Sequence, residues 1–291
     1  MTDTGRRAGV LGLGIIGSRV AARLQSAGFP LAVWNRTARD DFSGLPALAS
    51  DPAAVAREAD ILQIFVADDE ALHRTVRDML PALGPGHVVV SHATVAPETV
   101  RVLAQEISAS TGAAFLDAPF TGSRDAAAQG QLNYYVSGDA PALARARPVL
   151  EASAKSILPC GEIGQASAIK LATNIMAAAA AVSLAEAIHL LRANGIDPQL
   201  LVSALENNAA RSGVTDLKLP CMLGGDFAPR FSARNMRKDL RLAQAAGAPD
   251  QRALTEAMLH LYEQACDAGL GDEDFATVVK VASSTPLKTG H

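Results

Sequence analysis

Two polar side chains begin an otherwise apolar face of the stretch GEIGQASAIKLATNIMAAAAAVSLAEA, at residues 161–187. The stretch is typical of a long helix rich in small residues, and Lys170 and Asn174 lie four positions apart in it, on one face. That face continues through three alanines, Ala178, Ala181 and Ala185. Burial disfavours an ammonium ion, so a lysine in an apolar cleft suits proton transfer, and a nearby amide can orient a substrate oxygen. A lone helix lysine is more often a solvated surface residue, and the pattern alone leaves both interpretations open.

A second group of residues could bind a phosphate. The segment VLGLGIIG contains G-x-G-x-x-G, with Gly12, Gly14 and Gly17 at the required spacing. The first glycine permits a tight turn, the second lets a pyrophosphate approach the backbone, and the third allows close packing of helix and strand. The backbone between them comes from three apolar residues, Leu13, Ile15 and Ile16. Because the motif follows an apolar strand and opens a helical pattern, it predicts a dinucleotide-binding loop.

The end of the next strand indicates which dinucleotide. A site selective for NAD usually places Asp or Glu there, where the carboxylate binds the ribose hydroxyls. This chain has Asn35, Arg36 and Thr37 instead. Nothing repels a 2′-phosphate, and Arg36 can bind one through two parallel hydrogen bonds or stack on the adenine. We therefore predict NADPH or NADP as the cofactor, with NAD less favoured.

The elements that must position these residues change in kind at about residue 165. Before it, apolar strands alternate with helical patterns, which predicts a doubly wound, mainly parallel Rossmann-like sheet. After it, only helices are predicted, with ranges 166–193, 198–208, 213–222, 232–247, 250–268 and 273–282. We expect a cofactor-binding domain at 1–165 and an all-α domain for substrate and oligomer contacts at 166–291, joined by the long helix.

Composition limits the partners. Of 291 residues, 26 are basic and 30 acidic, and no basic block stands out, which argues against a nucleic-acid or membrane partner. The three cysteines are far apart, with no spacing typical of a metal site or disulfide framework. The first residues lack the apolar run of a signal peptide, and the apolar run at 171–191 contains Asn174, Glu186 and His189, so a buried helix is favoured over a membrane span. We expect a cytoplasmic protein.

Four blocks, in order and over nearly the whole chain, resemble the β-hydroxyacid dehydrogenase family. The first is GLGIIG with the later NRT. The second, DAPFTGS at 117–123, is similar to D-A-P-V-S-G-G. The third, GEIGQASAIKLATN, is similar to G-x-x-G-x-x-x-x-x-K-x-x-x-N, and the last, KDLRLA at 238–243, is similar to K-D-L-x-L-A. The resemblance implies a Rossmann domain followed by a helical domain, and a homodimer or homotetramer.

The resemblance also implies roles for single residues. Lys170 matches the catalytic lysine and Asn174 the residue that orients the substrate. Thr121 and Gly122 match the residues that hold the carboxylate of a small substrate, and Ser123 could contribute a further hydroxyl. The remaining implied contacts are to the cofactor and come from Thr94, in SHATVAP, and Lys238. His92 directly precedes this loop, so we keep it as a possible site residue.

The chain departs from the family pattern at several of these positions. Thr121 replaces a serine, which keeps the hydroxyl but adds a methyl group. Phe120 replaces a smaller valine. Ser123 replaces the second glycine, a form similar to the glyoxylate and succinic semialdehyde reductase branch. Tyr134 and Tyr135 stand where aliphatic strand residues are expected, and we interpret them as sheet residues.

These patterns favour an NADPH-dependent reductase that interconverts a small aldehyde or keto acid and its hydroxy acid, as for glyoxylate or succinic semialdehyde. One alternative is a 3-hydroxyisobutyrate-type dehydrogenase that runs oxidatively, which a preference for NAD would favour. Another is an imine reductase, although those enzymes generally carry Asp or Tyr at the position of Lys170. A non-enzymatic interaction module is disfavoured, because the lysine is present and no basic arm is attached.

Overall fold

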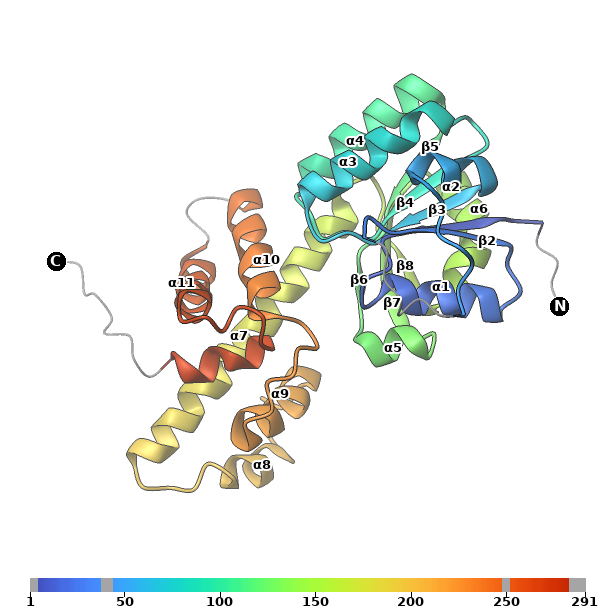
Figure 1. Cartoon of the computed structure of the whole chain (residues 1–291). Helices are drawn as coiled ribbons and strands as arrows, with labels where there is room; N and C mark the ends of the chain where they lie inside the picture. Colours follow the sequence, from blue (N-terminus) through green and yellow to red (C-terminus); the bar gives the residue numbers. More distant parts are fainter. Residues whose placement is uncertain (1–4, 38–43, 248–251, 283–291) are drawn as a thin grey trace. The chain divides into compact units, whose positions relative to one another are not determined.

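The structure, a computed structural model, describes residues 5–37, 44–247 and 252–282. The chain divides into two compact units, residues 1–170 and 171–291 (Figure 1). The division falls inside helix α7 (Gln165–Ala193), which begins in the first unit and continues into the second. The fold is therefore the predicted one: a Rossmann-like unit, then an all-α unit, with one long helix common to both.

The first unit is built on an eight-stranded sheet. Its order is β2-β1-β3-β4-β5-β7-β6, with β8 beside β7. The strands are β1 (Ala8–Leu11), β2 (Leu31–Trp34), β3 (Ile61–Ile64), β4 (Val88–Ser91), β5 (Ala114–Asp117), β6 (Phe120–Thr121), β7 (Leu132–Gly138) and β8 (Ala154–Pro159). Pairing is parallel from β2 to β5 and antiparallel where β7 meets β5 and β6. All residues of β1, β3 and β4 are buried, as expected for central strands covered on both faces.

Helices cover both faces of this sheet. The helices are α1 (Gly17–Ser26), α2 (Pro52–Glu58), α3 (Asp69–Met79), α4 (Pro97–Thr111), α5 (Arg124–Ala128) and α6 (Ala140–Glu151). Side chains of α1, α5 and α6 share one apolar core with the sheet, and those of α2, α3 and α4 form the core on the opposite face. In Figure 1, α3 and α4 lie side by side over their face. A short 3₁₀-helix, η2 (Leu80–Ala82), follows α3.

Local chemistry explains where these helices begin. The Asp51 carboxylate accepts a hydrogen bond from the Ala54 N–H at 2.8 Å, and a proline follows at the first helical position. That hydrogen bond holds the pKa of Asp51 below its usual range. Asp68 and Asp139 cap α3 and α6 in the same way. Acidic caps and prolines thus separate one β-α unit from the next.

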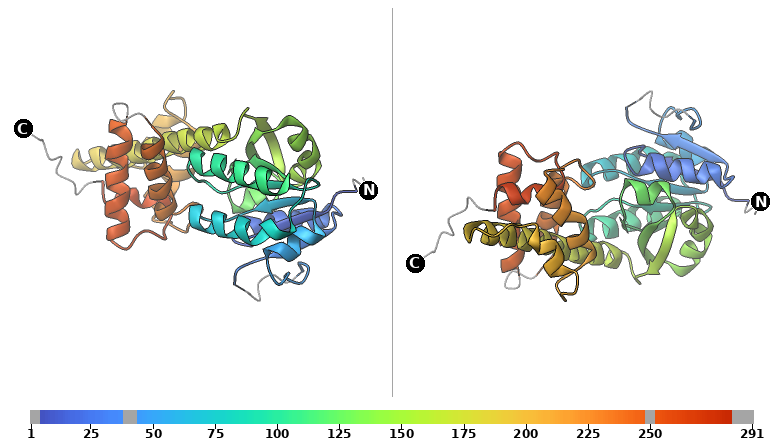
Figure 2. Two further views of the ribbon diagram at one scale, coloured as in Figure 1. Left: turned by 90° about the horizontal axis from the view of Figure 1, so that it is seen from above. Right: turned by 90° about the horizontal axis from the view of Figure 1, so that it is seen from below.

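The second unit is helical throughout its described part. Its elements after α7 are α8 (Leu200–Leu205), α9 (Gly213–Gly224), α10 (Ala233–Ala246), α11 (Ala253–Asp267) and the 3₁₀-helix η4 (Phe275–Lys280). Helices α10 and α11 pack against each other (Figure 2). The predicted helix at 198–208 is shorter in the structure, and the one at 273–282 is a 3₁₀-helix begun by the Asp274 cap. The predicted start at 250 lies outside the described residues.

The alanine face of α7 explains how this unit packs. Three alanines continue the face of Lys170 and Asn174 and are fully buried, namely Ala178, Ala181 and Ala185. They join a core with α9, α10, α11 and η4. The small side chains of α7 and the larger ones of the other helices thus form one buried core.

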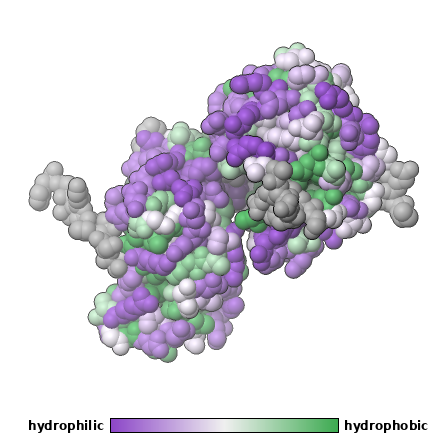
Figure 3. Space-filling model, viewed as in Figure 1, coloured by the Kyte–Doolittle hydropathy of each residue, from purple (hydrophilic) through white to green (hydrophobic). Residues whose placement is uncertain are grey.

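Helix α7 is long and apolar enough to cross a membrane by length and composition, and 44% of its most apolar window is buried inside the protein. A core helix passes the same test. On the face in Figure 3, hydrophilic residues are interspersed with smaller hydrophobic patches on both units.

Candidate active site

The turn between β1 and α1 has the geometry of a phosphate-binding loop. Gly12 has φ of +94°, and a side-chain carbon there would collide with the Phe65 carbonyl oxygen. One on Gly17 would collide with the Gly12 carbonyl oxygen. Gly14 differs, because no described atom lies within 4 Å of the corresponding position. Packing within the protein therefore requires glycine at positions 12 and 17, whereas Gly14 faces open space.

The N-terminus of α1 is also suited to an anion. Its cap residue, Ile16, makes no side-chain capping bond, and the first turn carries no acidic residue. The N–H groups of Ser18, Arg19 and Val20 already donate to the carbonyl oxygens of Gly14 and Ile16, so the attraction for an anion comes from the helix dipole and from the N–H groups that precede Ser18. With the open space at Gly14, this arrangement fits the pyrophosphate of a dinucleotide.

The side chain of Asn35 belongs to the loop itself. Its Oδ1 accepts a hydrogen bond from the Leu13 N–H at 2.9 Å, and its Nδ2 donates to the Thr37 carbonyl oxygen at 2.7 Å. Both ends of the amide therefore tie the residues after β2 to the glycine loop. Arg36 and Thr37 are exposed. Of these three predicted cofactor residues, Asn35 shapes the loop and Arg36 offers a charge to the surroundings.

The predicted carboxylate-binding residues all lie in the segment 117–123. Thr121 and Gly122 are exposed and adjacent, and Gly122 has φ of +148°, which favours glycine. Ser123 caps α5, where its Oγ accepts from the Ala126 N–H at 3.3 Å. Because that hydroxyl accepts a bond, its own proton stays available to donate. Arg124 is exposed and paired with Asp125 at 3.1 Å.

Asp117 connects this segment to the start of α7, and the sequence analysis did not single it out. Its Oδ1 accepts from the Ser167 hydroxyl at 2.8 Å, and its Oδ2 accepts from the Ser167 N–H at 2.9 Å and the Ser137 hydroxyl at 3.2 Å. Asp117 is fully buried. Burial raises the pKa of its carboxyl, and the bonds from the two serines oppose that rise.

The hydrogen bonds between Asp117 and Ser167 also bear on the position of Lys170. It lies three residues after Ser167 in α7 and is half-buried. A helix is rigid over one turn, so the hydrogen bonds at Ser167 also set where the Lys170 side chain starts. The sequence signals for Asp117 are its place at the end of an apolar strand and its match to the first residue of the D-A-P-V-S-G-G pattern.

In the second unit, Asn174 is held by a carboxylate. Its Nδ2 donates to Asp239 Oδ2 at 2.6 Å, and Asp239 Oδ1 lies 3.0 Å from Lys238 Nζ. Asn174 is 8% exposed and Asp239 is 1% exposed. Because the amide nitrogen is committed to Asp239, the amide oxygen is fixed as the acceptor that Asn174 offers elsewhere.

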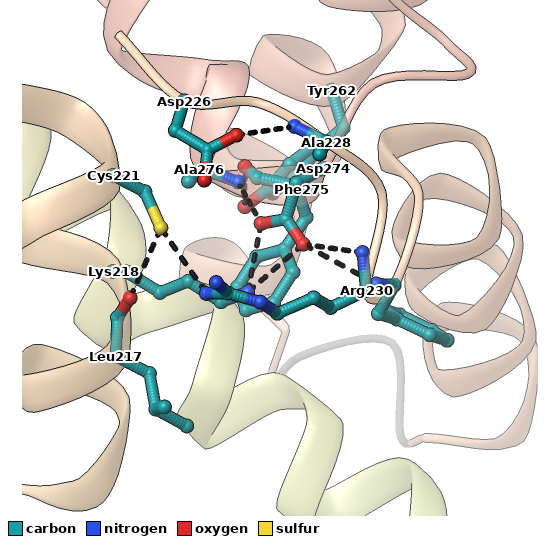
Figure 4. A network of polar contacts seen from close by, with 11 residues as sticks. Leu217, Lys218, Cys221, Asp226, Ala228, Arg230, Tyr262, Asp274, Phe275 and Ala276 are labelled. Atoms are coloured by element: carbon teal, nitrogen blue, oxygen red, sulfur yellow. Dashed lines mark hydrogen bonds and ion pairs between the residues drawn. The ribbon is translucent and has the colours of Figure 1, made fainter. Parts of the chain in front are cut away.

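A buried ion pair positions the start of α10, the helix that carries Lys238 (Figure 4). Lys218 Nζ donates to the two oxygens of Asp274 at 2.7 and 3.0 Å. The same carboxylate accepts from three backbone N–H groups, those of Arg230, Phe231 and Ala276. It thereby fixes the segment that leads into α10.

The predicted site residues therefore fall into two groups. Those in the first unit are Gly12, Leu13, Gly14, Ile15, Ile16, Asn35, Arg36, Thr37, Thr94, Thr121, Gly122, Ser123 and Lys170, and those in the second are Asn174 and Lys238. Within the first group, hydrogen bonds connect the glycine loop with the end of β2, and 117–123 with the start of α7. Thr94 is half-buried in the connection from β4 to α4.

Two family models match the chain. The model described as the NAD binding domain of 6-phosphogluconate dehydrogenase matches residues 7–161. The model described as NAD-binding of NADP-dependent 3-hydroxyisobutyrate dehydrogenase matches residues 164–282. Together they cover both units.

Individual proteins are similar over the same length. Glyoxylate/succinic semialdehyde reductase 2, chloroplastic, of Arabidopsis thaliana is 34% identical, with 94% of this chain and 78% of that protein covered. The cytokine-like nuclear factor N-PAC of Mus musculus is 30% identical over 96% of this chain, which spans only 52% of that protein. The structure of 3-hydroxyisobutyrate dehydrogenase from Mycobacterium tuberculosis with L-serine has a TM-score of 0.86 and 27% identity, with 94% of this chain and 98% of that one covered.

Proposed function

Because this chain belongs to the β-hydroxyacid dehydrogenase family of NAD(P)-dependent oxidoreductases that act on CH–OH groups, we propose that it is an NADPH-dependent reductase of small aldehyde acids. Glyoxylate and succinic semialdehyde are the first candidate substrates. The observation that carries the proposal is the double role of the Asp117 region. Asp117 begins the segment that ends in Thr121, Gly122 and Ser123, and its carboxylate anchors the helix turn before Lys170.

The residues present divide the chemistry between them. When bound, the reduced nicotinamide supplies a hydride to the carbonyl carbon. The carbonyl oxygen then gains a proton, which Lys170 delivers from Nζ, and water returns a proton to the amine. Asn174 offers its amide oxygen as a hydrogen-bond acceptor, because its amide nitrogen already donates to Asp239. No metal is needed in this scheme, since the ammonium group itself stabilises the developing negative charge on oxygen.

Carboxylate binding falls to the segment after Asp117. The Thr121 hydroxyl, the Gly122 N–H and the Ser123 hydroxyl can each donate to a carboxylate oxygen, and Thr121 and Gly122 are exposed to receive it. An aldehyde acid of two to four carbons offers both groups that the residues address, a carboxylate and a reducible carbonyl. This is the support for a small acid as the substrate class.

The described residues at the end of β2 support NADPH over NADH. Residues 35–37 carry no carboxylate that would bind the ribose hydroxyls or repel a 2′-phosphate, and the amide of Asn35 is used within the loop. Arg36 is exposed beside it and can form bidentate hydrogen bonds to a phosphate. The family model matched by residues 164–282 is described as NAD-binding of an NADP-dependent enzyme, 3-hydroxyisobutyrate dehydrogenase.

The test is oxidation of NADPH, and separately of NADH, across glyoxylate, succinic semialdehyde, tartronate semialdehyde, methylmalonate semialdehyde and a cyclic imine. We expect turnover of at least one aldehyde acid with NADPH, and a drop of at least about 10²-fold in kcat for Lys170→Ala. Lys155→Ala, at an exposed position of β8, is the matched control and keeps full activity. No measurable turnover of any aldehyde acid, or normal turnover by Lys170→Ala, would overturn the proposal.

A second candidate is oxidation of a 3-hydroxy acid, which the likeness to the M. tuberculosis 3-hydroxyisobutyrate dehydrogenase favours. Faster reduction of NAD by 3-hydroxyisobutyrate than oxidation of NADPH by any aldehyde acid would select it. In either case we propose a cytoplasmic homodimer or homotetramer, which light scattering after size-exclusion chromatography tests.

A further inference from the structure

Four aromatic rings pack together beside the segment 117–123. The imidazole of His92 stacks on Phe65, with ring centroids 4.3 Å apart, and lies 5.0 Å from the ring of Tyr134. Phe120 completes the cluster, at 6.1 Å from Phe65 and 6.2 Å from Tyr134. All four residues belong to the first unit. We call them the aromatic cluster.

The cluster brings together positions that the sequence analysis left unexplained. Phe120 stands where the family pattern has valine, and Tyr134 where an aliphatic residue is expected. In the structure these two residues are opposite each other in the β6–β7 pair, and the next pair is Thr121 with Asn133. Successive side chains of a strand point to opposite faces, so the Phe120 ring supports the backbone of the segment from the face opposite the Thr121 hydroxyl. The ring of His92 contacts both aromatic residues, with centroids 6.4 Å from Phe120 and 5.0 Å from Tyr134.

His92 is bonded to the backbone of the substrate segment. Its Nδ1 lies 2.7 Å from the Ala118 carbonyl oxygen, and the Ala118 N–H donates to the Ser91 carbonyl oxygen, also at 2.7 Å. Both backbone groups of Ala118 are thus held by consecutive residues at the end of β4. His92 is 3% exposed. Its ring therefore contacts no substrate and acts only through the segment.

The protonation state of His92 follows from burial. Burial lowers the pKa of its imidazole to about 4, so the ring is neutral at neutral pH. A neutral ring has one N–H, and the carbonyl oxygen at Nδ1 requires it there, which leaves Nε2 as an acceptor. The atom of Gln63 that lies 3.0 Å from Nε2 is its amide oxygen Oε1. Two acceptors cannot share a hydrogen bond, so this tautomer requires the amide to be turned by 180°, which brings to the ring the NH₂ group that otherwise has no partner among the described residues. The amide also keeps the ring from rotating.

We propose that His92 is a positioning residue for the proposed reduction: its hydrogen bond to Ala118, together with the aromatic cluster, sets where Thr121 and Gly122 meet the substrate carboxylate. The inference rests on the proposed function. Thr121 and Gly122 address a part of the substrate that does not react, so a segment held less firmly weakens substrate binding and raises KM. Binding of the carboxylate then depends on a residue that never touches the substrate.

Two substitutions of His92 test the contribution of its aromatic ring and that of its hydrogen bond separately. His92→Phe keeps an aromatic ring and removes the donor, whereas His92→Asn keeps a donor near the position of Nδ1 and removes the ring. We expect His92→Phe to raise KM for the best aldehyde acid about tenfold, the effect of one hydrogen bond, with the Kd of NADPH unchanged. His92→Asn recovers part of the loss. His87→Phe is the matched control, because His87 also contacts a backbone carbonyl, that of Ala56, outside the segment.

Hydrogen–deuterium exchange of the intact protein supplies a readout that needs no activity. We expect faster exchange of peptides that cover 118–123 in His92→Phe than in the unsubstituted protein or in His87→Phe. Unchanged exchange and unchanged KM would overturn the inference. If the unsubstituted protein reduces no aldehyde acid but the exchange still rises, the proposed function fails while the positioning role stands.

Discussion

The buried, neutral state of His92 makes the stability of the first unit depend on pH. In the folded chain burial lowers the pKa of this imidazole to about 4, from an ordinary value of 6.5. The hydrogen bond to the Ala118 carbonyl opposes this shift but is the smaller effect. Between these two pH values the unfolded chain binds a proton at His92 and the folded chain does not. His92 therefore makes stability rise with pH across this window, and the gain is lost as pH falls through it.

The size follows from the two pKa values. The difference of about 2.5 units, at 1.36 kcal/mol per unit, gives a loss of about 3 kcal/mol between pH 6.5 and pH 4. That is a large part of the roughly 5–15 kcal/mol by which ordinary domains are stable. Asn at position 92 does not titrate, so the dependence of the unfolding free energy on pH lacks this contribution in His92→Asn.

The chain contains a single tryptophan, Trp34 in β2, in the same unit as His92. Denaturant unfolding followed by Trp34 fluorescence at several pH values from 8 to 4.5 therefore reports the relevant unit. We expect the gap in unfolding free energy between the unsubstituted protein and His92→Asn to narrow by about 2–3 kcal/mol over that range. Tyr134→Phe is the control and keeps the slope, because burial raises the pKa of Tyr134 and takes it further from this window. Parallel curves for His92→Asn and the unsubstituted protein would refute the reasoning.

Two further predictions concern the cofactor and the second unit. Arg36→Ala should raise the Kd of NADPH about tenfold or more, the loss of a charge-assisted contact, with the Kd of NADH nearly unchanged; equal effects on both would mean that Arg36 does not face the 2′-phosphate. Asp274→Ala should cost about 3–5 kcal/mol of stability, because it leaves the Lys218 ammonium buried without its partner. It should cost more than Lys218→Met, since three backbone N–H groups also lose their acceptor. Denaturant unfolding followed by far-UV circular dichroism, which reports the helices of the second unit together with the rest of the chain, tests the order, and a larger loss for Lys218→Met would contradict it.

The fold could be predicted because its signals are local. Central strands such as Ile61–Ile64 are apolar throughout, and helices such as Pro52–Glu58 begin at an acidic cap with a proline. The alternation ends where the long alanine-rich helix begins, which indicated the change from sheet to helices. Burial patterns and helix caps involve only a few neighbouring residues, so the sequence alone indicates them.

The parts that were missed depend on residues far apart in sequence. Asp117 and Ser167 are separated by 50 positions, and His92 and Ala118 by 26. No spacing rule connects such pairs. The parallel pairing of β4 and β5 brings His92 to Ala118, and the position of the first turn of α7 at the end of β5 brings Ser167 to Asp117. The short β6 and α5 were missed for a related reason: β6 exists through its pairing with β7 rather than through its own two residues.

These long-range contacts meet at one place, the end of β5. Asp117 is tied to the first turn of α7, and Ala118, the next residue, is tied on both its N–H and its carbonyl to the end of β4. The segment that continues to Thr121 therefore starts from a point that cannot shift without breaking bonds to two other elements. The two anchors are separate, because the Asp117 carboxylate accepts from Ser167 and Ser137 whereas the Ala118 backbone is bonded to Ser91 and His92. Only the Asp117 anchor reaches the lysine-bearing helix. We therefore expect KM and kcat to respond together when Asp117 itself is changed, and KM alone to respond when only His92 is changed.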